Sequence, residues 1–399
     1  MVKALPASSL DDDLRTHLDA RESAAIRRHL RPISSGMGPR IVVDGQSILQ
    51  FCSNDYLGIT SHPEVTRAAE VALSRYGTGA GSARLVVGTS SPHAKLEQAL
   101  AQLKQTEAAL ALSSGYHANT GVLPALTTSE DVIFSDALNH ASIIDGCRLS
   151  HAATKIYRHN DVEHLATLLS TTSTARRRFI VTESVFAMDG DLAPLSTLVS
   201  IAKKYDALLV VDEAHATGVF GPGGGGLVQE LELGTHIAVQ IGTLSKAIGA
   251  LGGYVAGSQT LIDTLINEAR TFIYTTALPP AVAASATAAI QVIIQEPERR
   301  EQLWNHTKFL RSALGVAGYH INPGNSPIIP VMVGDAAITL ALSNALFEHG
   351  VLVSAIRPPT VPAGTARLRV TPMATHTQTD LEEAVDAFRA VGRDTGYIK

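Results

Sequence analysis

Short apolar runs alternate with helical segments between about residues 65 and 260, and this alternation constrains the fold more than any other feature. Runs of this length are typical of buried strands. Strands that alternate with helices predict a mainly parallel sheet covered by helices. In such sheets, ligands bind beyond the carboxyl ends of the strands. The seven runs are 108–112, 132–134, 155–157, 180–182, 208–211, 237–241 and 253–256.

Lys246 follows one of these runs, in the segment Gly242-Thr243-Leu244-Ser245-Lys246-Ala247-Ile248-Gly249. A lysine among small residues at the end of a buried strand is partly desolvated, and desolvation lowers the pKa of an ammonium group. A neutral amine can attack an aldehyde and form a Schiff base. The alternative interpretation is a solvated surface lysine, which is the ordinary state of this residue type.

Asp212 ends the apolar run 208–211 and is followed closely by His215. An aspartate at this edge of the sheet can keep a pyridinium nitrogen protonated, and His215 can reach the same pocket. Asp212 could also be a helix cap. The tetrapeptide Asp-Glu-Ala-His occurs in nucleotide hydrolases too, but the chain has no Gly-Lys pair for a phosphate loop. No third ligand at a useful spacing supports a metal site.

Two further strand ends carry polar residues. The run 108–112 leads into Ser113-Ser114-Gly115-Tyr116 and a helix start, whose free N–H groups can bind a phosphate. Thr243 adds a hydroxyl from the lysine segment. His140 follows the run 132–134 and could stack on a flat ring, although each of these segments alone is also compatible with an ordinary turn.

Composition excludes several classes of protein. The formal net charge of -5 does not favour nucleic acid or anionic membranes as partners. Two cysteines, Cys52 and Cys147, do not form a disulfide framework and fit a reducing compartment. The N-terminus lacks the apolar core of a signal peptide, and no stretch has the length and apolar character of a membrane span. We therefore expect a cytoplasmic protein.

The chain of 399 residues is long enough for two domains. Residues 11–30 predict an amphipathic helix, and residues 42–51 predict a hairpin around Asp44-Gly45. We expect an N-terminal helix and arm (1–60), a large domain (61–290) and a small C-terminal α/β domain (291–399). The glycine-rich run 221–226 predicts a flexible loop.

Together these segments resemble the α-oxoamine synthases, a family within the PLP-dependent aminotransferase-like superfamily. The resemblance extends from Leu18-Asp19-Ala20-Arg21 to about Thr371. The most family-specific stretches are Ser53-Asn54-Asp55-Tyr56-Leu57-Gly58, Ser113-Ser114-Gly115-Tyr116, Met188-Asp189-Gly190-Asp191 and Asp212-Glu213-Ala214-His215. Residues 355–369 are similar to those of family members that condense L-alanine with a pimeloyl thioester in biotin biosynthesis.

The resemblance implies a fold type I PLP-dependent transferase, an α/β fold with a mainly parallel seven-stranded sheet in its large domain and a smaller C-terminal domain. It implies that Lys246 holds pyridoxal 5'-phosphate (PLP) and removes the alanine α-proton, while Asp212 keeps the ring nitrogen protonated. His140 would stack on the ring and His215 would bond its phenolic oxygen. The resemblance does not distinguish between coenzyme A and an acyl carrier protein as the carrier of the acyl group.

The resemblance also implies the remaining binding residues. Gly115, Tyr116 and Thr243 match phosphate-binding positions, and Thr275 and Thr276 match a pair that reaches the partner's phosphate in a homodimer. Substrate-site positions are matched by Arg27, Asn54, His140, Arg357 and Thr360, with Arg357 pairing with the amino-acid carboxylate.

Three residues depart from the family pattern: Ala187 and Ala83 replace usual serines, and Gly225 stands where an arginine is common. The alternatives are another α-oxoamine synthase, such as a glycine C-acetyltransferase, or a PLP-binding regulatory module. A regulatory module of this kind would need an appended DNA-binding segment, and the sequence contains no visible one.

Overall fold

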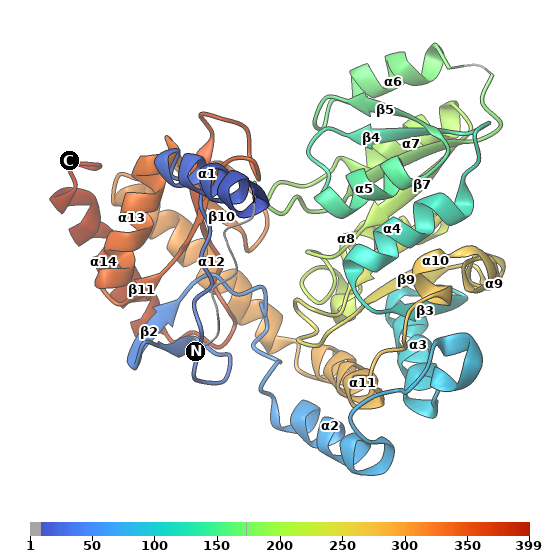
Figure 1. Cartoon of the computed structure of the whole chain (residues 1–399), viewed down its shortest axis with the longest axis horizontal. Helices are drawn as coiled ribbons and strands as arrows, with labels where there is room; N and C mark the ends of the chain where they lie inside the picture. Colours follow the sequence, from blue (N-terminus) through green and yellow to red (C-terminus); the bar gives the residue numbers. More distant parts are fainter. Residues whose placement is uncertain (1–8, 173) are drawn as a thin grey trace.

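The computed structural model of the chain describes residues 9–172 and 174–399. It has two lobes, and the larger one contains the central sheet (Figure 1). The helices α11 (Pro280–Gln295) and α12 (Glu298–Val316) lead from the larger to the smaller lobe, and only Glu296 and Pro297 separate them. The crossing therefore lies at the Glu296-Pro297 step.

The central sheet has seven strands, and every predicted apolar run contributes one of them. All neighbouring pairs are parallel except those of β9, which is antiparallel to both neighbours. The predicted fold class is therefore confirmed. In spatial order the strands are β3 (Ala108–Leu112), β9 (Gly253–Gly257), β8 (Val239–Thr243), β7 (Ala207–Asp212), β6 (Arg178–Glu183), β4 (Val132–Asp136) and β5 (Ala153–Tyr157).

Helices cover both faces of the sheet, because alternate strand residues point to opposite sides and are apolar on both. One face carries Ile180 and Leu209 and packs on α2 (Pro63–Tyr76), α3 (Ser91–Lys104), α6 (Val162–Ser170), α7 (Leu195–Lys204) and α11. The other carries Val181 and Val210 and packs on α4 (Gly115–Leu126), α5 (Ala141–Leu149), α9 (Gln259–Glu268) and α10 (Arg270–Ile273).

The smaller lobe holds two three-stranded sheets. One consists of β10 (Ile329–Gly334), β13 (Ala366–Val370) and β12 (Ser354–Ile356), and it packs against α12, α13 (Ala336–Glu348) and α14 (Gln378–Asp394). The other joins β1 (Arg40–Val43) and β2 (Gln46–Gln50) to β11 (Val351–Leu352). The N-terminal hairpin thus belongs to the C-terminal lobe, and the predicted turn at Asp44-Gly45 is confirmed by φ angles of 51° and 77°.

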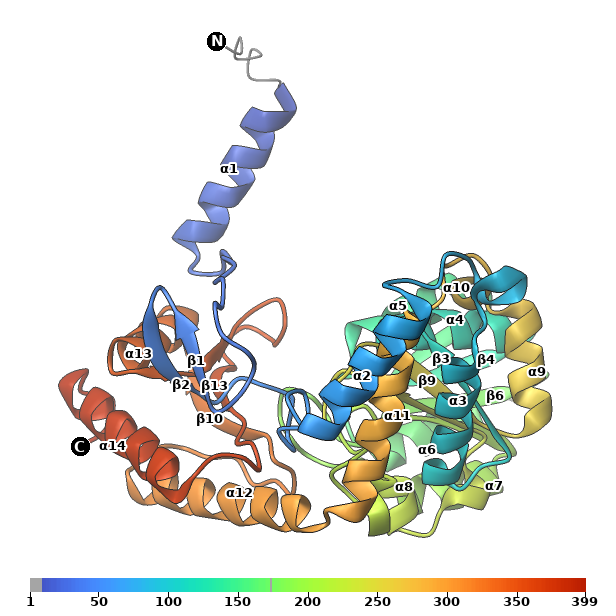
Figure 2. The same ribbon diagram turned by 90° about the horizontal axis from the view of Figure 1, so that it is seen from below.

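Helix α1 (Ser9–Ser23) projects away from the body of the molecule (Figure 2). The prediction of a helix over residues 11–30 is wrong at its end, because Ala25 has a φ of 54°, which no right-handed helix contains. The basic residues that follow, Arg27 and Arg28, lie in an irregular segment instead of on the helix.

The glycine-rich run 221–226 is packed, so the prediction of a flexible loop is wrong. It contains the turn η2 (Pro222–Gly224) and leads into α8 (Leu227–Glu230) and η3 (Gly234–His236). Gly226 has a φ of 112°, and a Cβ added there would lie 2.3 Å from the Glu213 carboxylate. Glycine is needed here both for its backbone conformation and for the close approach of Glu213.

Within residues 9–172 and 174–399, no helix is both long and apolar enough to cross a bilayer. The N-terminal residues before Ser9, on which part of the expectation of no signal peptide depends, lie outside the described residues. The domain limits 1–60, 61–290 and 291–399 stay predictions.

Candidate active site

Three polar side chains lie side by side where β6, β7 and β8 end. Glu183, Asp212 and Thr243 are the last residues of these strands, and Glu183 is paired in register with Asp212. All three have the same alternation as Val181, Val210 and Ile241, so they point to the face covered by α4 and α5. The site is therefore built at the carboxyl edge of the sheet, as the sequence predicts.

Asp212 is buried and receives two hydrogen bonds. Asn119 on α4 donates from Nδ2 to Oδ2 over 2.7 Å, and the Ala214 N–H donates to Oδ1 over 2.8 Å. Asp212 is thus a fixed negative charge inside the protein, suited to holding a cationic ring nitrogen.

Lys246 lies three residues beyond β8, in a turn closed by a 2.8 Å hydrogen bond from the Gly249 N–H to the Lys246 carbonyl. Burial lowers the pKa of its amine to about 8, although the nearby carboxylates of Asp212 and Glu183 act in the opposite direction. About a tenth of the amine is therefore uncharged at pH 7, far more than for an ordinary lysine, and this form can act as a nucleophile or a base.

Two histidines face this lysine. His140 caps α5: its Nδ1 accepts from the Ser142 N–H over 3.2 Å, and burial together with Lys246 lowers its pKa. The buried His215 pairs its Nδ1 with the Tyr56 hydroxyl over 2.7 Å, and burial keeps its pKa well below the usual range. Both imidazoles are consequently neutral at pH 7.

The start of α4 forms a cradle for an anion. Ser114 caps the helix by accepting from the His117 N–H over 3.1 Å, which leaves Gly115 and Tyr116 at the first two positions. N–H groups there have no carbonyl within the helix to bind. A Cβ added to Gly115 would lie 3.2 Å from the Thr243 side chain, so glycine keeps the space between them open.

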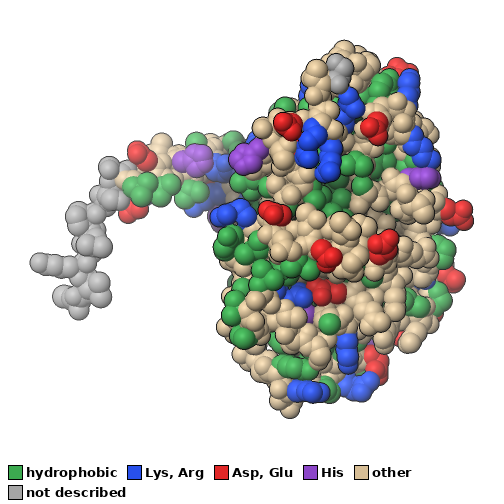
Figure 3. Space-filling view, turned by 90° about the vertical axis from the view of Figure 1, so that its right-hand side faces the viewer, with side chains coloured by type: hydrophobic (Ala, Val, Ile, Leu, Met, Phe, Trp, Pro, Cys, Tyr) green, Lys and Arg blue, Asp and Glu red, His purple; other side chains and the backbone are tan. Residues whose placement is uncertain are grey.

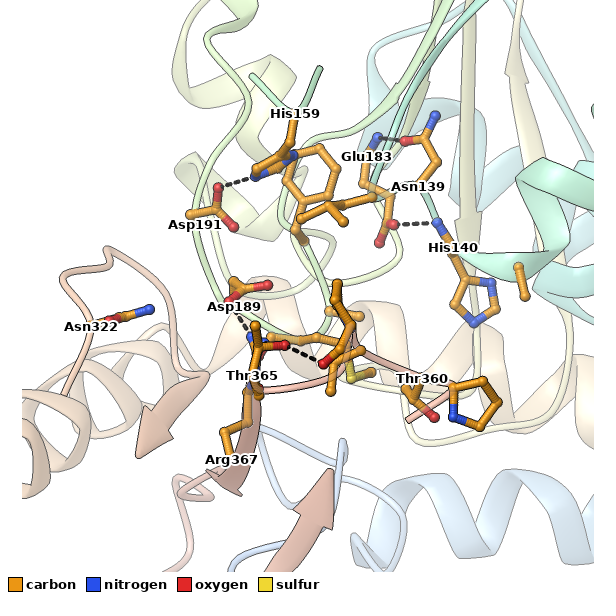
Figure 4. Close-up of a pocket in the computed structure, with 18 of the residues that line it drawn as sticks. Asn139, His140, His159, Glu183, Asp189, Asp191, Asn322, Thr360, Thr365 and Arg367 are labelled. Atoms are coloured by element: carbon orange, nitrogen blue, oxygen red, sulfur yellow. Dashed lines mark hydrogen bonds and ion pairs between the residues drawn. The ribbon is translucent and has the colours of Figure 1, made fainter. Parts of the chain in front are cut away.

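A cavity of about 970 Å³ opens beside these residues, between the two lobes. Figure 4 shows Glu183 and His140 on its large-lobe side and Thr360, Thr365 and Arg367 on its small-lobe side. Many of its lining side chains are apolar: Leu138, Ile144, Phe186, Ala187, Met188, Pro323, Met332, Pro359, Val361 and Pro362.

Apart from His140, the predicted substrate residues lie in three segments: Arg27 after α1, Asn54 after β2, and Arg357 and Thr360 after β12. Arg357 donates to the Ala25 carbonyl. Thr360 lines the cavity and accepts from Arg28 over 3.1 Å. Arg27 lies 3.7 Å from Glu22, whereas Asn54 accepts from both terminal nitrogens of Arg369 at 3.2 Å.

Thr275 and Thr276 are not brought to this cavity. They lie between α10 and α11 and line a separate space of about 10 Å³ together with Ser113. The backbone of Thr276 forms an isolated antiparallel bridge with Ala83, which precedes the helical turn η1 (Arg84–Gly88).

Sequence reasoning did not identify four residues that this site contains: Glu183, Asn119, Tyr56 and Arg369. Glu183 ends the run 180–182 as Asp212 ends the run 208–211, so the same strand-end argument finds it. Arg369 carried a weaker signal, a buried arginine within an alternating strand: its Nε donates to the Ala187 carbonyl over 2.7 Å. Nothing in the local sequence connects Tyr56 with His215.

A model of the family "Aminotransferase class I and II" matches residues 46–388. Curated relatives named 8-amino-7-oxononanoate synthase match over nearly their full length. That of Geobacter sulfurreducens is 48% identical over 93% of this chain and 95% of its own, and that of Symbiobacterium thermophilum is 44% identical over 98% and 100%. The chain belongs to the 8-amino-7-oxononanoate synthase family. Members of this family are enzymes, and the family resemblance seen in the sequence is confirmed.

Several solved structures have the same fold as this chain. A serine palmitoyltransferase from Sphingomonas wittichii superposes with a TM-score of 0.93 at 32% identity, covering 99% of this chain and all of that chain. A high-resolution structure of SPT with a PLP internal aldimine also reaches 0.93, at 33% identity over 99% and 100%. The 8-amino-7-oxononanoate synthase from Francisella tularensis gives 0.76 at 28% identity, over 88% and 99%.

The residues of this family member fit PLP. An amine with a lowered pKa lies near the fixed carboxylate of Asp212, as a group with an aldehyde and a ring nitrogen requires. A glycine-lined helix start faces Thr243 at the position for a phosphate. Lys246, Asp212 and the start of α4 would therefore hold the three ends of the cofactor.

Proposed function

We propose that this chain is a PLP-dependent acyltransferase that condenses L-alanine with a pimeloyl thioester. The products are 8-amino-7-oxononanoate, carbon dioxide and the free thiol, in biotin biosynthesis. The observation that carries the proposal is near-full-length identity of 44–48% to 8-amino-7-oxononanoate synthases, in a chain whose buried Lys246 amine lies at the same sheet edge as Asp212.

When bound, PLP supplies an aldehyde that condenses with amines and a pyridinium ring that withdraws electrons from the adjoining carbon. Lys246 Nζ takes the proton from the alanine α-carbon in its uncharged form, which the lowered pKa makes accessible near neutral pH. Asp212 holds the proton on the ring nitrogen through its fixed charge. His140 would stack on the ring, and His215, oriented by Tyr56, would bond the ring oxygen.

Phosphate binding falls to the N–H groups of Gly115 and Tyr116 and to Thr243. Arg357 binds the alanine carboxylate, since its guanidinium donates to the Ala25 carbonyl and forms no ion pair with a carboxylate among the described residues. Thr360, Arg27 and Asn54 complete the substrate side. The apolar cavity wall, including Ala187, accommodates the acyl chain.

The exposed hydrophobic residues around η1 support a homodimer. Leu85, Val86 and Val87 of η1 are exposed, and Tyr274 near the same surface is exposed as well. Hydrophobic side chains gather on the side of the body from which α1 projects (Figure 3). Because Thr276 is bridged to Ala83 beside η1, a partner that covers these residues meets the Thr275-Thr276 pair. The pair then contributes to the partner's phosphate site.

The second candidate is a sibling synthase that uses another amino acid or acyl thioester. The higher TM-score to serine palmitoyltransferases than to the solved 8-amino-7-oxononanoate synthase is the observation that favours it. Turnover with alanine, glycine and serine, each paired with pimeloyl, acetyl and palmitoyl coenzyme A, separates the two.

The deciding experiment combines labelling with turnover. Borohydride reduction of the PLP-loaded protein, followed by peptide mapping, is expected to label Lys246, and pimeloyl coenzyme A with alanine is expected to give 8-amino-7-oxononanoate. Lys95, an exposed lysine on α3, is the internal control and stays unlabelled. Label on a lysine other than Lys246 contradicts the site, and exclusive turnover of another substrate pair contradicts the assigned substrates.

A further inference from the structure

Glu183 is a buried carboxyl group at the wall of the active-site cavity. Its side chain is 4% exposed, and it lines the cavity next to His140. The His140 N–H donates to Oε1 over 2.6 Å (Figure 4). Among the residues that the structure describes, nothing is hydrogen-bonded to Oε2. One oxygen is therefore engaged, while the other is available to a ligand in the cavity.

Charges around Glu183 decide its protonation. Asp212 on β7 and Asp136 on β4 are the neighbouring anions, and Lys246 beyond β8 is the neighbouring cation. Burial, followed by the charge of Asp212, raises the pKa of Glu183 to about 8. The imidazole of His140 has a lowered pKa and adds no charge at pH 7.

Hydrogen bonding also favours a protonated Glu183. Asp212 accepts from the side chain of Asn119 and the N–H of Ala214, whereas Glu183 accepts from one N–H only. Two neighbouring carboxylates cannot both ionise at low cost, and the better solvated one keeps the charge. The proton between this pair therefore belongs to Glu183.

The bond from His140 also fixes where that proton lies. An oxygen that accepts from an N–H acts as the carbonyl oxygen of a neutral carboxyl group, so the hydroxyl is at Oε2. Glu183 thus presents an O–H donor to the cavity. A donor at the cavity wall without a protein partner fits a ligand that presents an acceptor oxygen at this position.

We propose that Glu183 donates a hydrogen bond from Oε2 to the acyl carbonyl oxygen of the thioester during the condensation. This inference rests on the proposed function. The amino-acid carbon attacks the acyl carbon and forms the new C–C bond, while negative charge develops on the carbonyl oxygen. The C–S bond then breaks, and the thiolate leaves with its electron pair. Glu183 keeps its proton throughout and acts only as a donor.

Two substitutions test the donor. Glu183→Leu removes it at similar size and is expected to lower turnover with pimeloyl coenzyme A by about 100- to 1,000-fold. Alanine binding, followed by the absorbance of the PLP-loaded protein, is expected to stay close to wild type. Glu183→Gln keeps an acceptor for the His140 N–H and places an N–H donor at the other atom, and is expected to lose less than about tenfold.

The pH profile separates the donor role from a merely structural one. Wild-type turnover is expected to fall above a pH of about 8, as Glu183 loses its proton. Glu183→Gln cannot lose a proton at this position, so its turnover is expected not to fall over this range and to rise as Lys246 loses its proton. Lys246 gives the opposite slope, because it is active when deprotonated. An alkaline fall that is unchanged in Glu183→Gln overturns the proposal, and so does a parallel loss of alanine binding in Glu183→Leu.

Infrared spectroscopy gives a readout that does not depend on turnover. The full-length protein is expected to show the C=O band of a buried protonated carboxyl group, which disappears as pH rises through about 8 and is absent in Glu183→Gln. Absence of this band in the wild type at pH 7 overturns the proposal. Wild-type turnover with alanine and pimeloyl coenzyme A, measured on the same preparation, tests the proposed function separately.

Discussion

At the scale of single residues, the amine of Lys246 makes the stability of the cofactor-free protein depend on pH. Its pKa is about 8 in the folded chain and 10.5 in the reference state. Below pH 8 both states carry the proton, and the folded state bears an unfavourable buried charge. Between pH 8 and 10.5 only the unfolded chain holds the proton, so the contribution of Lys246 to stability rises with pH.

We therefore expect Lys246→Met to raise the unfolding free energy of the cofactor-free protein at pH 7 by about 1–3 kcal/mol. The gain shrinks as the pH rises from 8 to 10.5, because the wild-type amine becomes neutral in the folded state. Urea titrations across this range measure the effect. Lys95→Met, on an exposed lysine, is the control, and equal effects of the two variants at pH 7 would contradict the prediction.

How far the sequence predicts the site depends on whether a residue is placed by its own strand. Asp212 and Lys246 follow buried strands, and the sheet alone brings them to one edge. Glu183 is placed by the same rule. Tyr56 contacts His215 from 159 residues away, and Arg369 contacts Asn54 from 315 residues away, so these contacts depend on packing that no local pattern encodes.

At the scale of elements, α3 is attached to the loop after β7 by a buried ion pair. Lys104, 3% exposed, ends α3 and lies 2.5 Å from Glu213, which is fully buried. Lys104 also donates to the carbonyl of Gly225, in the glycine-rich run. The strands were predictable from their apolar runs. The packing of the glycine-rich run was not predictable, because it depends on the cation of Lys104 from a distant helix.

Lys104→Met is expected to destabilise the protein by about 3–5 kcal/mol, because it leaves the Glu213 charge buried without a partner. Adding Glu213→Gln to this variant is expected to restore much of the loss, since no buried charge then remains. Chemical denaturation measures both. Arg67→Met, which removes the exposed pair with Glu64, serves as the comparison and leaves stability unchanged within error. A Lys104→Met variant as stable as wild type would refute the argument.

At the scale of the whole molecule, the proposed homodimer places the exposed residues of η1 in its interface. Val86 and Val87 are 73% and 77% exposed, and a homodimer would cover them. Val86→Asp places a charge in this surface and is expected to convert the dimer to monomers, with loss of PLP affinity, in sedimentation and cofactor titration. Val316→Asp, at an 81% exposed position on α12, is the matched control. A dimer that survives Val86→Asp would place the interface elsewhere.

The pairing of β2 with β11 has a consequence for synthesis on the ribosome. Strand β2 ends at Gln50, and its parallel partner begins at Val351. Translation proceeds at about 5–20 residues per second, so the hairpin waits about 15–60 s for that partner. All seven strands of the central sheet emerge during this interval. The large lobe can thus fold on the ribosome while the first strands of the chain still have one open edge, which chaperones can bind until the last quarter of the chain is made.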